Sequence, residues 1–354
     1  MSLKFTALFL LFFGQQAFAL DCLKTRGAFD IGSEETKLKI AVVDTCKNKI
    51  KEVLVDERRP INFLGNVISD PKNEFTLEFL LHAASEINEM KALGDKFQVQ
   101  EWTAVVTSAF RKASNAKESD EKLQVLTRLN TVIIDEKLET EIGFYGALSI
   151  TNTPKEDLVV FDLGGGSAQI SFYDDLKDEV LSYSNIYSSQ HAKEFLYRIV
   201  QKKTTDLPKK DWDPNPVTQE QAYGFFEFYS RMLFSEFQES RILEFSSDYL
   251  WYKMNNKNSK FVAIGGVIAS GVGRGLTGET SGSLSLSMLF DGIKKYQDKS
   301  SEEIGGGAYV QSDMSNLLLT AAYFYVYLLK RDVPVQYADV SLTEGLLIYP
   351  NLTM

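Results

Sequence analysis

The chain has 354 residues and a formal net charge of −10 at pH 7, with 44% hydrophobic and 24% charged residues. This acidic balance argues against nucleic acid as a general partner and against a broad electrostatic attraction for long polyanions. The length predicts two domains, with ample apolar material for their cores.

The first 19 residues predict a cleaved secretion signal. Lys4 precedes an apolar run over 5–13, and Ala17-Phe18-Ala19 matches a small-x-small cleavage site. This segment is too short to span a bilayer, and no later run is long and apolar enough. We expect a periplasmic or secreted protein without a membrane span. A lipoprotein anchored through Cys22 is a weaker alternative, because Asp21 stands where a small residue is needed.

The cysteines Cys22 and Cys46 flank the first predicted hairpin. In an oxidising compartment the default is one disulfide between them, and the alternative is two buried thiols. Two cysteines and two histidines leave little material for a zinc site or for a Cys–His or Ser–His nucleophile.

The first half opens with a predicted hairpin of strands over 24–31 and 36–43, with Asp30 near the end of its first strand. A third strand is expected over 50–58. The further elements predicted in this half are a helix over 76–93 that stops at Gly94, a strand over 100–108, a helix opening at 111–115, a strand over 132–135 and a helix over 136–148.

Residues 158–173 form the most informative stretch. Leu158–Phe161 predicts a buried strand, which Asp162 ends, and Gly164–Gly166 permits a turn with positive φ. The alternation over 167–173 predicts a half-buried second strand. The three glycines leave backbone N–H donors open to an anion, and the carboxylate can hold a metal or a water. The alternative is a glycine hairpin without a ligand. It is not a Walker loop, because no Gly-Lys-Ser/Thr follows.

The rest of the second half is predicted to contain helices, a polar loop and one strand. Six residues of its long aromatic helix are interpreted as core rather than as cofactor contacts: Phe225, Phe226, Phe228, Tyr229, Leu233 and Phe237. The elements expected are a helix over 189–204, a polar loop over 202–217, a long helix or helix pair over 219–245, a strand over 261–264, and helices over 284–295 and 312–331.

The two Asp-x-Gly hairpins, at Asp30 and Asp162, stand about 130 residues apart, near the start of each half. This duplication predicts an α/β protein with two related domains. We expect them over 20–150 and 151–335, after the signal at 1–19, with a C-terminal segment over 336–354 that packs near the domain interface.

Several motifs together resemble the exopolyphosphatase / guanosine pentaphosphate phosphatase (Ppx/GppA) family of the actin, sugar-kinase and Hsp70 superfamily. The most specific is the block from Thr107 to Asn115. In chain order the motifs are Asp30-Ile31-Gly32-Ser33, Thr107-Ser108-Ala109-Phe110-Arg111-Lys112-Ala113-Ser114-Asn115, Glu139, Asp162 to Gln169, Gly265-Gly266 and Glu344-Gly345-Leu346-Leu347.

The resemblance implies two ribonuclease-H-like (actin-like ATPase) domains that face an interdomain cleft. It implies Mg²⁺-dependent hydrolysis of a terminal phosphoanhydride by a water that a glutamate activates. The substrates implied are polyphosphate or nucleotide phosphates, and we expect a homodimer and no nucleic-acid partner.

Site residues carry over from the matched motifs. Arg111 offers a planar fork for phosphate, and Glu139 is the expected base or water-positioner. Asp30 and Asp162 are the expected ligands of Mg²⁺. An exposed helix face is the alternative for Glu139, because Glu136 and Glu141 stand nearby. The expected phosphate-binding residues of the two hairpins are Gly32, Ser33, Gly164, Gly165, Gly166 and Ser167.

The chain departs from the family pattern at both hairpins. Glu34 and Glu35 replace Asn and Ser or Thr, and two carboxylates at a phosphate-binding turn repel the substrate unless they point away or bind metal. Gln169 replaces a glutamate, which is similar to the secreted apyrases, where a glutamine there helps to orient the attacking water. Val267 stands where the family often carries Thr.

Two functions are therefore kept open. The first is an exported phosphoanhydride hydrolase acting on polyphosphate, guanosine pentaphosphate or related nucleotides, with Glu139, Gln169 and Arg111 as its catalytic residues. The second is a catalytically weak relative that senses phosphate compounds or binds another protein. Arg111 and Glu139 favour the first, whereas Glu34 and Glu35 favour the second.

Overall fold

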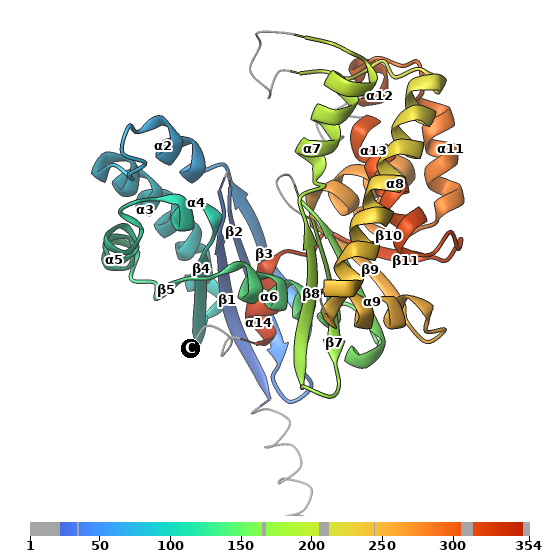
Figure 1. Ribbon diagram of the computed structural model, residues 1–354. Coiled ribbons are helices and arrows are strands. Elements are labelled where there is room, and N and C mark those ends of the chain that lie inside the picture. The colour runs from blue at the N-terminus through green and yellow to red at the C-terminus, as the bar shows by residue number, and fades with distance from the viewer. Residues whose placement is uncertain are drawn as a thin grey trace, which may run out of the picture. The chain divides into compact units, whose positions relative to one another are not determined.

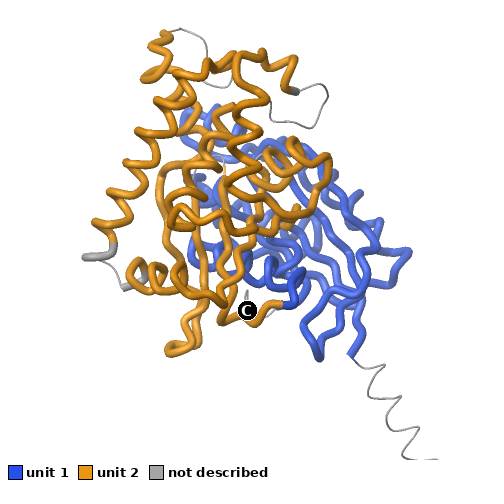
Figure 2. Tube along the Cα trace, turned by 90° about the vertical axis from the view of Figure 1, so that its right-hand side faces the viewer, with its two compact units in different colours: residues 1–152, 341–354 blue, residues 153–340 orange. Residues whose placement is uncertain are grey.

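The computed structural model describes residues 22–33, 35–164, 168–204, 212–243, 245–305 and 314–349. The predicted secretion signal lies outside the described residues. The chain divides into two compact units, the first formed by Met1–Asn152 with Ser341–Met354 and the second by Thr153–Val340 (Figure 2). Each unit has its own sheet.

The sheet of the first unit has five strands in the order β3-β2-β1-β4-β5. The first three pair antiparallel, whereas β4 lies parallel to β1 and β5 parallel to β4. The strands are β1 (Leu23–Ile31), β2 (Thr36–Asp44), β3 (Lys49–Arg59), β4 (Glu101–Val106) and β5 (Thr131–Ile133).

The sheet of the second unit has the order β10-β11-β9-β6-β7-β8. Its strands are β6 (Leu158–Leu163), β7 (Ala168–Asp174), β8 (Glu179–Asn185), β9 (Lys260–Ile264), β10 (Ser281–Leu284) and β11 (Val335–Ala338). Counted in chain order within each unit and without β10, the strands of both sheets lie in the order third, second, first, fourth and fifth. Corresponding neighbours also pair in the same directions. This repetition confirms the predicted α/β class with two related domains.

Alternating side chains give the first sheet two buried faces. Phe29 and Ile31 lie in one core cluster with helices α2 (Phe63–Ser69), α3 (Leu77–Ala92), α4 (Ser108–Lys112) and α5 (Ala116–Thr127). Their neighbour Ala28 lies in the opposite cluster, beneath α6 (Glu136–Ser149) and α14 (Leu342–Ile348). Because strand residues alternate between faces, one strand serves both cores. The C-terminal helix α14 is thus part of the first unit.

The second unit has one large core cluster, built around α13 (Met314–Tyr327). All but one residue of α13 is buried, as expected for a helix that is apolar on every side. It packs against α7 (Ser189–Glu194), α8 (Gln219–Leu243) and α11 (Leu286–Tyr296) (Figure 1). The remaining elements are α9 (Phe245–Asn255), α10 (Arg274–Thr277), α12 (Ser301–Gly305), the 3₁₀ turns η1 (Leu93–Phe97) and η2 (Lys155–Asp157), and the π-helical turns η3 (Phe195–Val200) and η5 (Gly266–Gly273).

Helix α3 ends at Ala92 with Leu93 as its C-cap, so Gly94 stands at the predicted C′ position. The chain then continues in the 3₁₀ turn η1, and Gln98 takes the left-handed conformation, with φ of 51°. Two local predictions are wrong. Strand β7 is not half-buried: all but one of its residues are buried, with Ala168, Ile170 and Phe172 in the core of the second unit. Phe228 is 52% exposed rather than core. Of its group, Phe225, Tyr229, Leu233 and Phe237 are buried.

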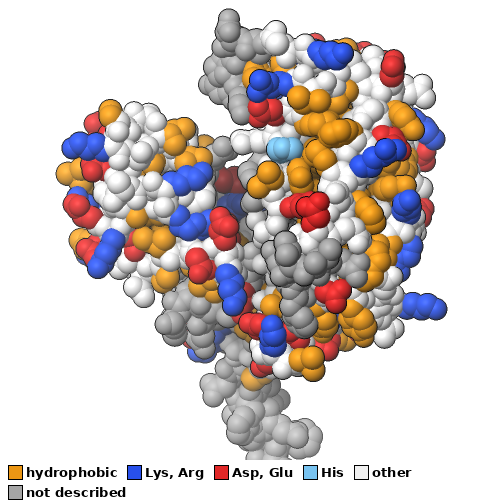
Figure 3. Space-filling model, viewed as in Figure 1, with side chains coloured by type: hydrophobic (Ala, Val, Ile, Leu, Met, Phe, Trp, Pro, Cys, Tyr) orange, Lys and Arg blue, Asp and Glu red, His pale blue; other side chains and the backbone are white. Residues whose placement is uncertain are grey.

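No helix among the described residues is both long and apolar enough to cross a bilayer. On the face shown in Figure 3, basic and acidic side chains are interspersed over each unit.

Candidate active site

The first hairpin places a buried acid beside a lysine. In the register of β1 and β2, Asp30 lies opposite Lys37, and the Lys37 Nζ is 3.8 Å from an Asp30 carboxylate oxygen. Asp30 is only 7% exposed, and this burial raises its pKa although the Lys37 charge opposes the shift. The same ammonium is 3.2 Å from the Glu35 carboxylate. Glu34 lies outside the described residues.

The turn of this hairpin is held to the short helix α4. The Gly32 N–H donates to the Glu35 carbonyl at 3.0 Å, and a Cβ on Gly32 would lie 2.8 Å from that oxygen. The Ser33 and Ser108 hydroxyls hydrogen-bond to each other at 2.5 Å. Since Ser108 begins α4, this contact ties the predicted phosphate-binding turn to the short helix that carries Arg111.

Arg111 and Glu139 form an ion pair. The Arg111 Nη1 is 2.9 Å from the Glu139 carboxylate and donates at 2.8 Å to the Ile134 carbonyl. Glu139 lies in the first turn of α6, where the helix dipole favours a carboxylate. The Glu139 side chain is 35% exposed and that of Arg111 is 23% exposed, whereas Glu136, one turn earlier, is an exposed residue. Glu139 is therefore not merely part of a solvated helix face.

Other residues of the Thr107–Asn115 block are structural. The Asn115 side-chain amide accepts from the Phe75 N–H and donates to the Phe75 carbonyl, both at 3.0 Å. The Ser114 hydroxyl donates at 2.8 Å to the Lys72 carbonyl. The expected helix opening at 111–115 is in fact the end of α4, and α5 begins after Asn115.

The second unit brings Asp162 against a glycine from a distant strand. Asp162 stands at the penultimate position of β6, opposite Gln169 on β7 and beside Ile264 on β9. Gly265, directly after β9, has φ of +83°, and a Cβ there would lie 2.4 Å from the Asp162 Oδ1. Only glycine leaves this space beside the carboxylate open.

The glycine turn after Asp162 is described only at its start. The Gly164 carbonyl accepts from the Ser189 N–H at 3.1 Å, and the Ser189 hydroxyl bonds to Asn316 Oδ1 on α13 at 2.5 Å. The predicted phosphate-binding residues Gly165, Gly166 and Ser167 lie outside the described residues.

The C-terminal motif has a structural use. Glu344 lies on α14, pairs with the Lys39 ammonium and accepts from the Ser341 N–H in a capping box. A Cβ on Gly345 would lie 2.1 Å from the Ile142 carbonyl, so the glycine permits the close packing of α14 on α6. The predicted disulfide between Cys22 and Cys46 is present.

Sequence reasoning missed Lys37 and Ser108. The hairpin register held the signal for Lys37, because a four-residue turn that sets Ile31 opposite Thr36 sets Asp30 opposite Lys37. Nothing in the sequence pairs Ser108 with Ser33, which lies 75 residues earlier.

Comparison with known proteins supports the fold. Residues 34–189 match the Ppx/GppA phosphatase family. A crystal structure of the Aquifex aeolicus Ppx/GppA family member aligns with a TM-score of 0.67 at 20% identity, over 93% of this chain and 98% of that one. An exopolyphosphatase from Cytophaga hutchinsonii aligns with a TM-score of 0.60 at 19% identity, over 93% and 98%.

Among curated proteins, the bifunctional 3-dehydroquinate synthase/phosphatase of Fusobacterium nucleatum is 28% identical over 153 residues. This match covers 41% of the chain but only 22% of that relative. The fold is thus the two-domain, actin-like arrangement with two ribonuclease-H-like domains. Over residues 34–189 the sequence is similar to the Ppx/GppA phosphatase family, and the fold is that of the solved Ppx/GppA structure.

Proposed function

We propose that this protein is an exported hydrolase that releases terminal phosphate from polyphosphate, guanosine pentaphosphate or related nucleotides. The observation that carries the proposal is the Arg111–Glu139 pair at 2.9 Å, at the start of α6. Phosphoryl transfer needs charge neutralisation at the phosphate oxygens and a positioned nucleophile more than it needs a covalent group. Arginine supplies the first, and a glutamate can hold a water for the second.

In this proposal Arg111 holds the transferred phosphate, together with the backbone N–H groups of the two glycine turns. A phosphate that binds Arg111 competes with Glu139 for the guanidinium. The released Glu139 carboxylate then accepts the proton of the attacking water, and Gln169 orients that water.

The chain also offers ligands for Mg²⁺, a cofactor that neutralises charge on phosphate oxygens. The carboxylates of Asp30 and Asp162 are hard oxygen donors of the kind Mg²⁺ prefers. Asp30 fits because burial raises its pKa although Lys37 is near, so a further cation stabilises its ionised form. Asp162 fits because Gly265 leaves the space beside its Oδ1 without a side chain.

A specific observation favours the second function, a weak hydrolase that senses phosphate compounds. The Lys37 ammonium lies within 3.8 Å of Asp30 and within 3.2 Å of Glu35, so acids of the same hairpin already neutralise it. This pairing makes Lys37 less available to a phosphate at the turn. Tight anion binding without turnover is the signature of this alternative.

The first prediction tests the base. Glu139→Gln is expected to lower turnover on the order of 10²- to 10⁴-fold, because the water loses its proton acceptor, with little change in KM. Glu136→Gln is the matched control: the same charge is removed from the same helical turn, at an exposed position. Rates of phosphate release from polyphosphate and from nucleotides with Mg²⁺ give turnover and KM for each variant. Equal turnover of the two variants would remove Glu139 from the mechanism.

A second pair of variants separates the hydrolase from the sensor. Glu34→Asn with Gln169→Glu restores the family residues. A large gain in phosphate release means that the native chain has lost catalytic groups, whereas a loss means that Gln169 belongs to a working, apyrase-like site. Native protein that releases no phosphate from any of these substrates with Mg²⁺ or Ca²⁺ ends the hydrolase proposal.

A further inference from the structure

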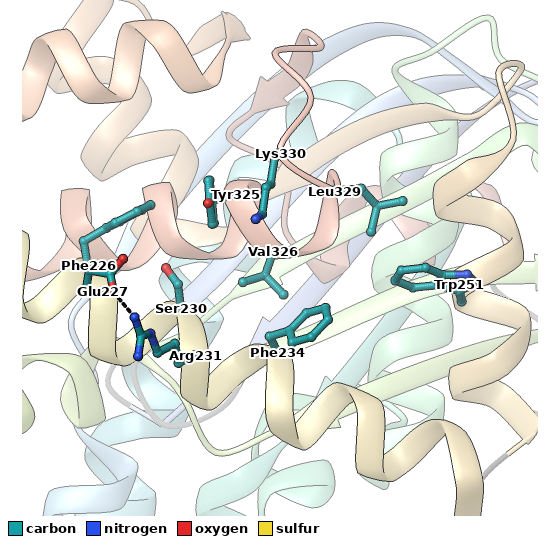
Figure 4. A pocket seen from close by; sticks show the side chains of 10 residues that line it. All are labelled: Phe226, Glu227, Ser230, Arg231, Phe234, Trp251, Tyr325, Val326, Leu329 and Lys330. Atoms are coloured by element: carbon teal, nitrogen blue, oxygen red, sulfur yellow. Dashed lines mark hydrogen bonds and ion pairs between the residues drawn. The ribbon is translucent and has the colours of Figure 1, made fainter.

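The second unit contains a cavity of about 450 Å³ between α8, α9 and the end of α13. Its volume lies within the range of about 300–1,000 Å³ that small-molecule sites occupy. None of its lining residues belongs to the candidate active site. They are Phe226, Glu227, Ser230, Arg231, Phe234, Trp251, Tyr325, Val326, Leu329 and Lys330 (Figure 4).

The walls of the cavity are aromatic and rigid. Phe226, Ser230 and Phe234 are spaced four residues apart and so lie along one face of α8. Phe226 packs edge to face on Tyr325 of α13, with ring centroids 5.1 Å apart. Trp251 lines the cavity from α9 (Figure 4). Aromatic side chains with few rotatable bonds favour a flat, apolar ligand body.

One polar group stands within these walls. Ser230 is 6% exposed, and its hydroxyl has no hydrogen-bond partner among the described residues, not even the preceding turn of its own helix. A buried hydroxyl without a hydrogen-bond partner costs free energy, and one hydrogen bond to a ligand would recover that cost. Ser230 lines the cavity, and although its hydroxyl oxygen is shielded from solvent, rotation about the Cα–Cβ bond would bring it to a polar atom of a ligand (Figure 4).

The charged residues of the lining leave a net positive charge. Arg231 pairs with Glu227 at 2.7 Å, and both side chains are largely exposed. Lys330 lies over the Tyr325 ring, 5.2 Å from its centroid, and forms no ion pair with any described residue. Leu329 and Lys330 take consecutive left-handed conformations just after α13, where the exposed Lys330 lines the cavity.

From these features we infer a binding site for a small organic anion with a flat aromatic body, distinct from the phosphate-binding hairpins. The body lies between α8 and α13 against Trp251. A polar atom of the ligand bonds to the Ser230 hydroxyl, and its acidic group pairs with the Lys330 ammonium. The walls are helices and offer no strand edge with which an extended peptide could pair, so the site is unsuited to such a peptide.

Anilinonaphthalenesulfonate, a flat aromatic sulfonate that fluoresces in apolar surroundings, is a suitable probe. We expect it to bind the native full-length protein with one molecule per chain. Ser230→Ala is expected to weaken binding about fivefold, because one hydrogen bond is lost. Lys330→Gln is expected to weaken it by a similar factor at low ionic strength, and less in high salt. Lys294→Gln, an exposed lysine on α11, is the matched control and should bind as the native protein does.

Two further variants locate the probe. Ser230→Phe should fill the cavity and lower affinity at least about tenfold, with thermal unfolding used to check that the variant is folded. Trp251→Phe should remove most of the energy transfer from tryptophan to the probe while binding persists. Native affinity in both Ser230→Phe and Lys330→Gln, or unchanged energy transfer in Trp251→Phe, would overturn the assignment, as would absence of binding to the native protein.

Discussion

At the scale of single residues, the carboxylate of Asp162 explains why a glycine is needed at position 265, about 100 residues later in the chain. Gly265 follows β9, yet its Cα faces the carboxylate of Asp162 on β6 because the two strands lie side by side. Its φ of +83° is itself a conformation that other residues adopt with difficulty. Glycine is thus needed at this position both for the positive φ and for the space beside the Asp162 carboxylate.

Replacing this glycine tests both roles. Gly265→Ala is expected to reduce the free energy of unfolding by about 1–3 kcal/mol, because alanine is strained at positive φ and its Cβ overlaps the Asp162 carboxylate. Turnover should also fall as Asp162 is displaced. Gly266→Ala, with nothing within 4 Å of an added Cβ, is the control and should change stability by less than about 1 kcal/mol. Urea unfolding that shows no difference between these variants would contradict this account.

A second residue gives the protein a pH dependence. The His191 ring contacts Tyr187, and its Nδ1 is 3.1 Å from the Tyr229 hydroxyl. Burial lowers the pKa of His191 from 6.5, although Glu194 opposes the shift. Near that pH the unfolded chain binds more protons than the folded chain, so this contribution to stability is present above pH 6.5 and is lost as the pH falls.

The variant His191→Phe keeps an aromatic ring against Tyr187 but cannot titrate. We expect the unfolding free energy of the native protein to fall more steeply than that of the variant between pH 6.5 and ~5. Urea titrations across this interval measure the two slopes. Parallel slopes would show that His191 is equally easy to protonate in both states.

At the scale of elements, the last helix is attached to the first unit by a buried ion pair. Lys39 of β2 lies between Glu344 of α14 and Asp56 of β3, whose carboxylate is 3.0 Å away. Burial pulls the pKa of Lys39 down, but the two carboxylates more than offset this and raise it. A charge so placed is stable only with its partners.

Removing one partner should therefore be worse than removing both. Glu344→Gln keeps the capping hydrogen bond but leaves Lys39 with Asp56 alone, and is expected to cost about 3 kcal/mol of stability. The double variant Lys39→Met with Glu344→Gln should recover much of that loss. Denaturant unfolding of the full chain provides the comparison. A double variant less stable than Glu344→Gln would mean that Lys39 stabilises α14 through other contacts.

At the scale of the whole molecule, the same strand order occurs in both units, and each unit carries an acid near the end of its first strand. The first unit is completed by α14, so its folding requires both ends of the described chain. The disulfide between Cys22 and Cys46 links the start of β1 to the turn after β2 in this same unit.

A final prediction is that the disulfide forms only when the chain is exported, because the periplasm is oxidising and the cytoplasm is reducing. In a Gram-negative host the full-length chain should reach the periplasm, lose its first 19 residues and contain the disulfide. Deletion of residues 2–19 should leave the chain in the cytoplasm with two free thiols and about 3 kcal/mol less stable. Cell fractionation with mass spectrometry of non-reduced peptides tests both outcomes. A truncated chain that is still exported would disprove the signal.

The sequence alone determined the features that depend on local order. Alternating apolar residues predicted β1 to β3 and β6, and helical spacing predicted α3 and α6 to within a few residues. The Asp-x-Gly repeat predicted two related domains, and the family motifs led to Arg111, Glu139 and Asp162. The seven-residue strand β8 and the four-residue strand β10 were not predicted from the sequence.

Only the tertiary structure decided which distant residues meet. The pairing of Arg111 with Glu139, the approach of Gly265 to Asp162 and the place of α14 beneath the first sheet all depend on strand order and helix packing. Such contacts join positions tens to hundreds of residues apart. Local propensity cannot encode them, because they arise only when each sheet buries both of its faces.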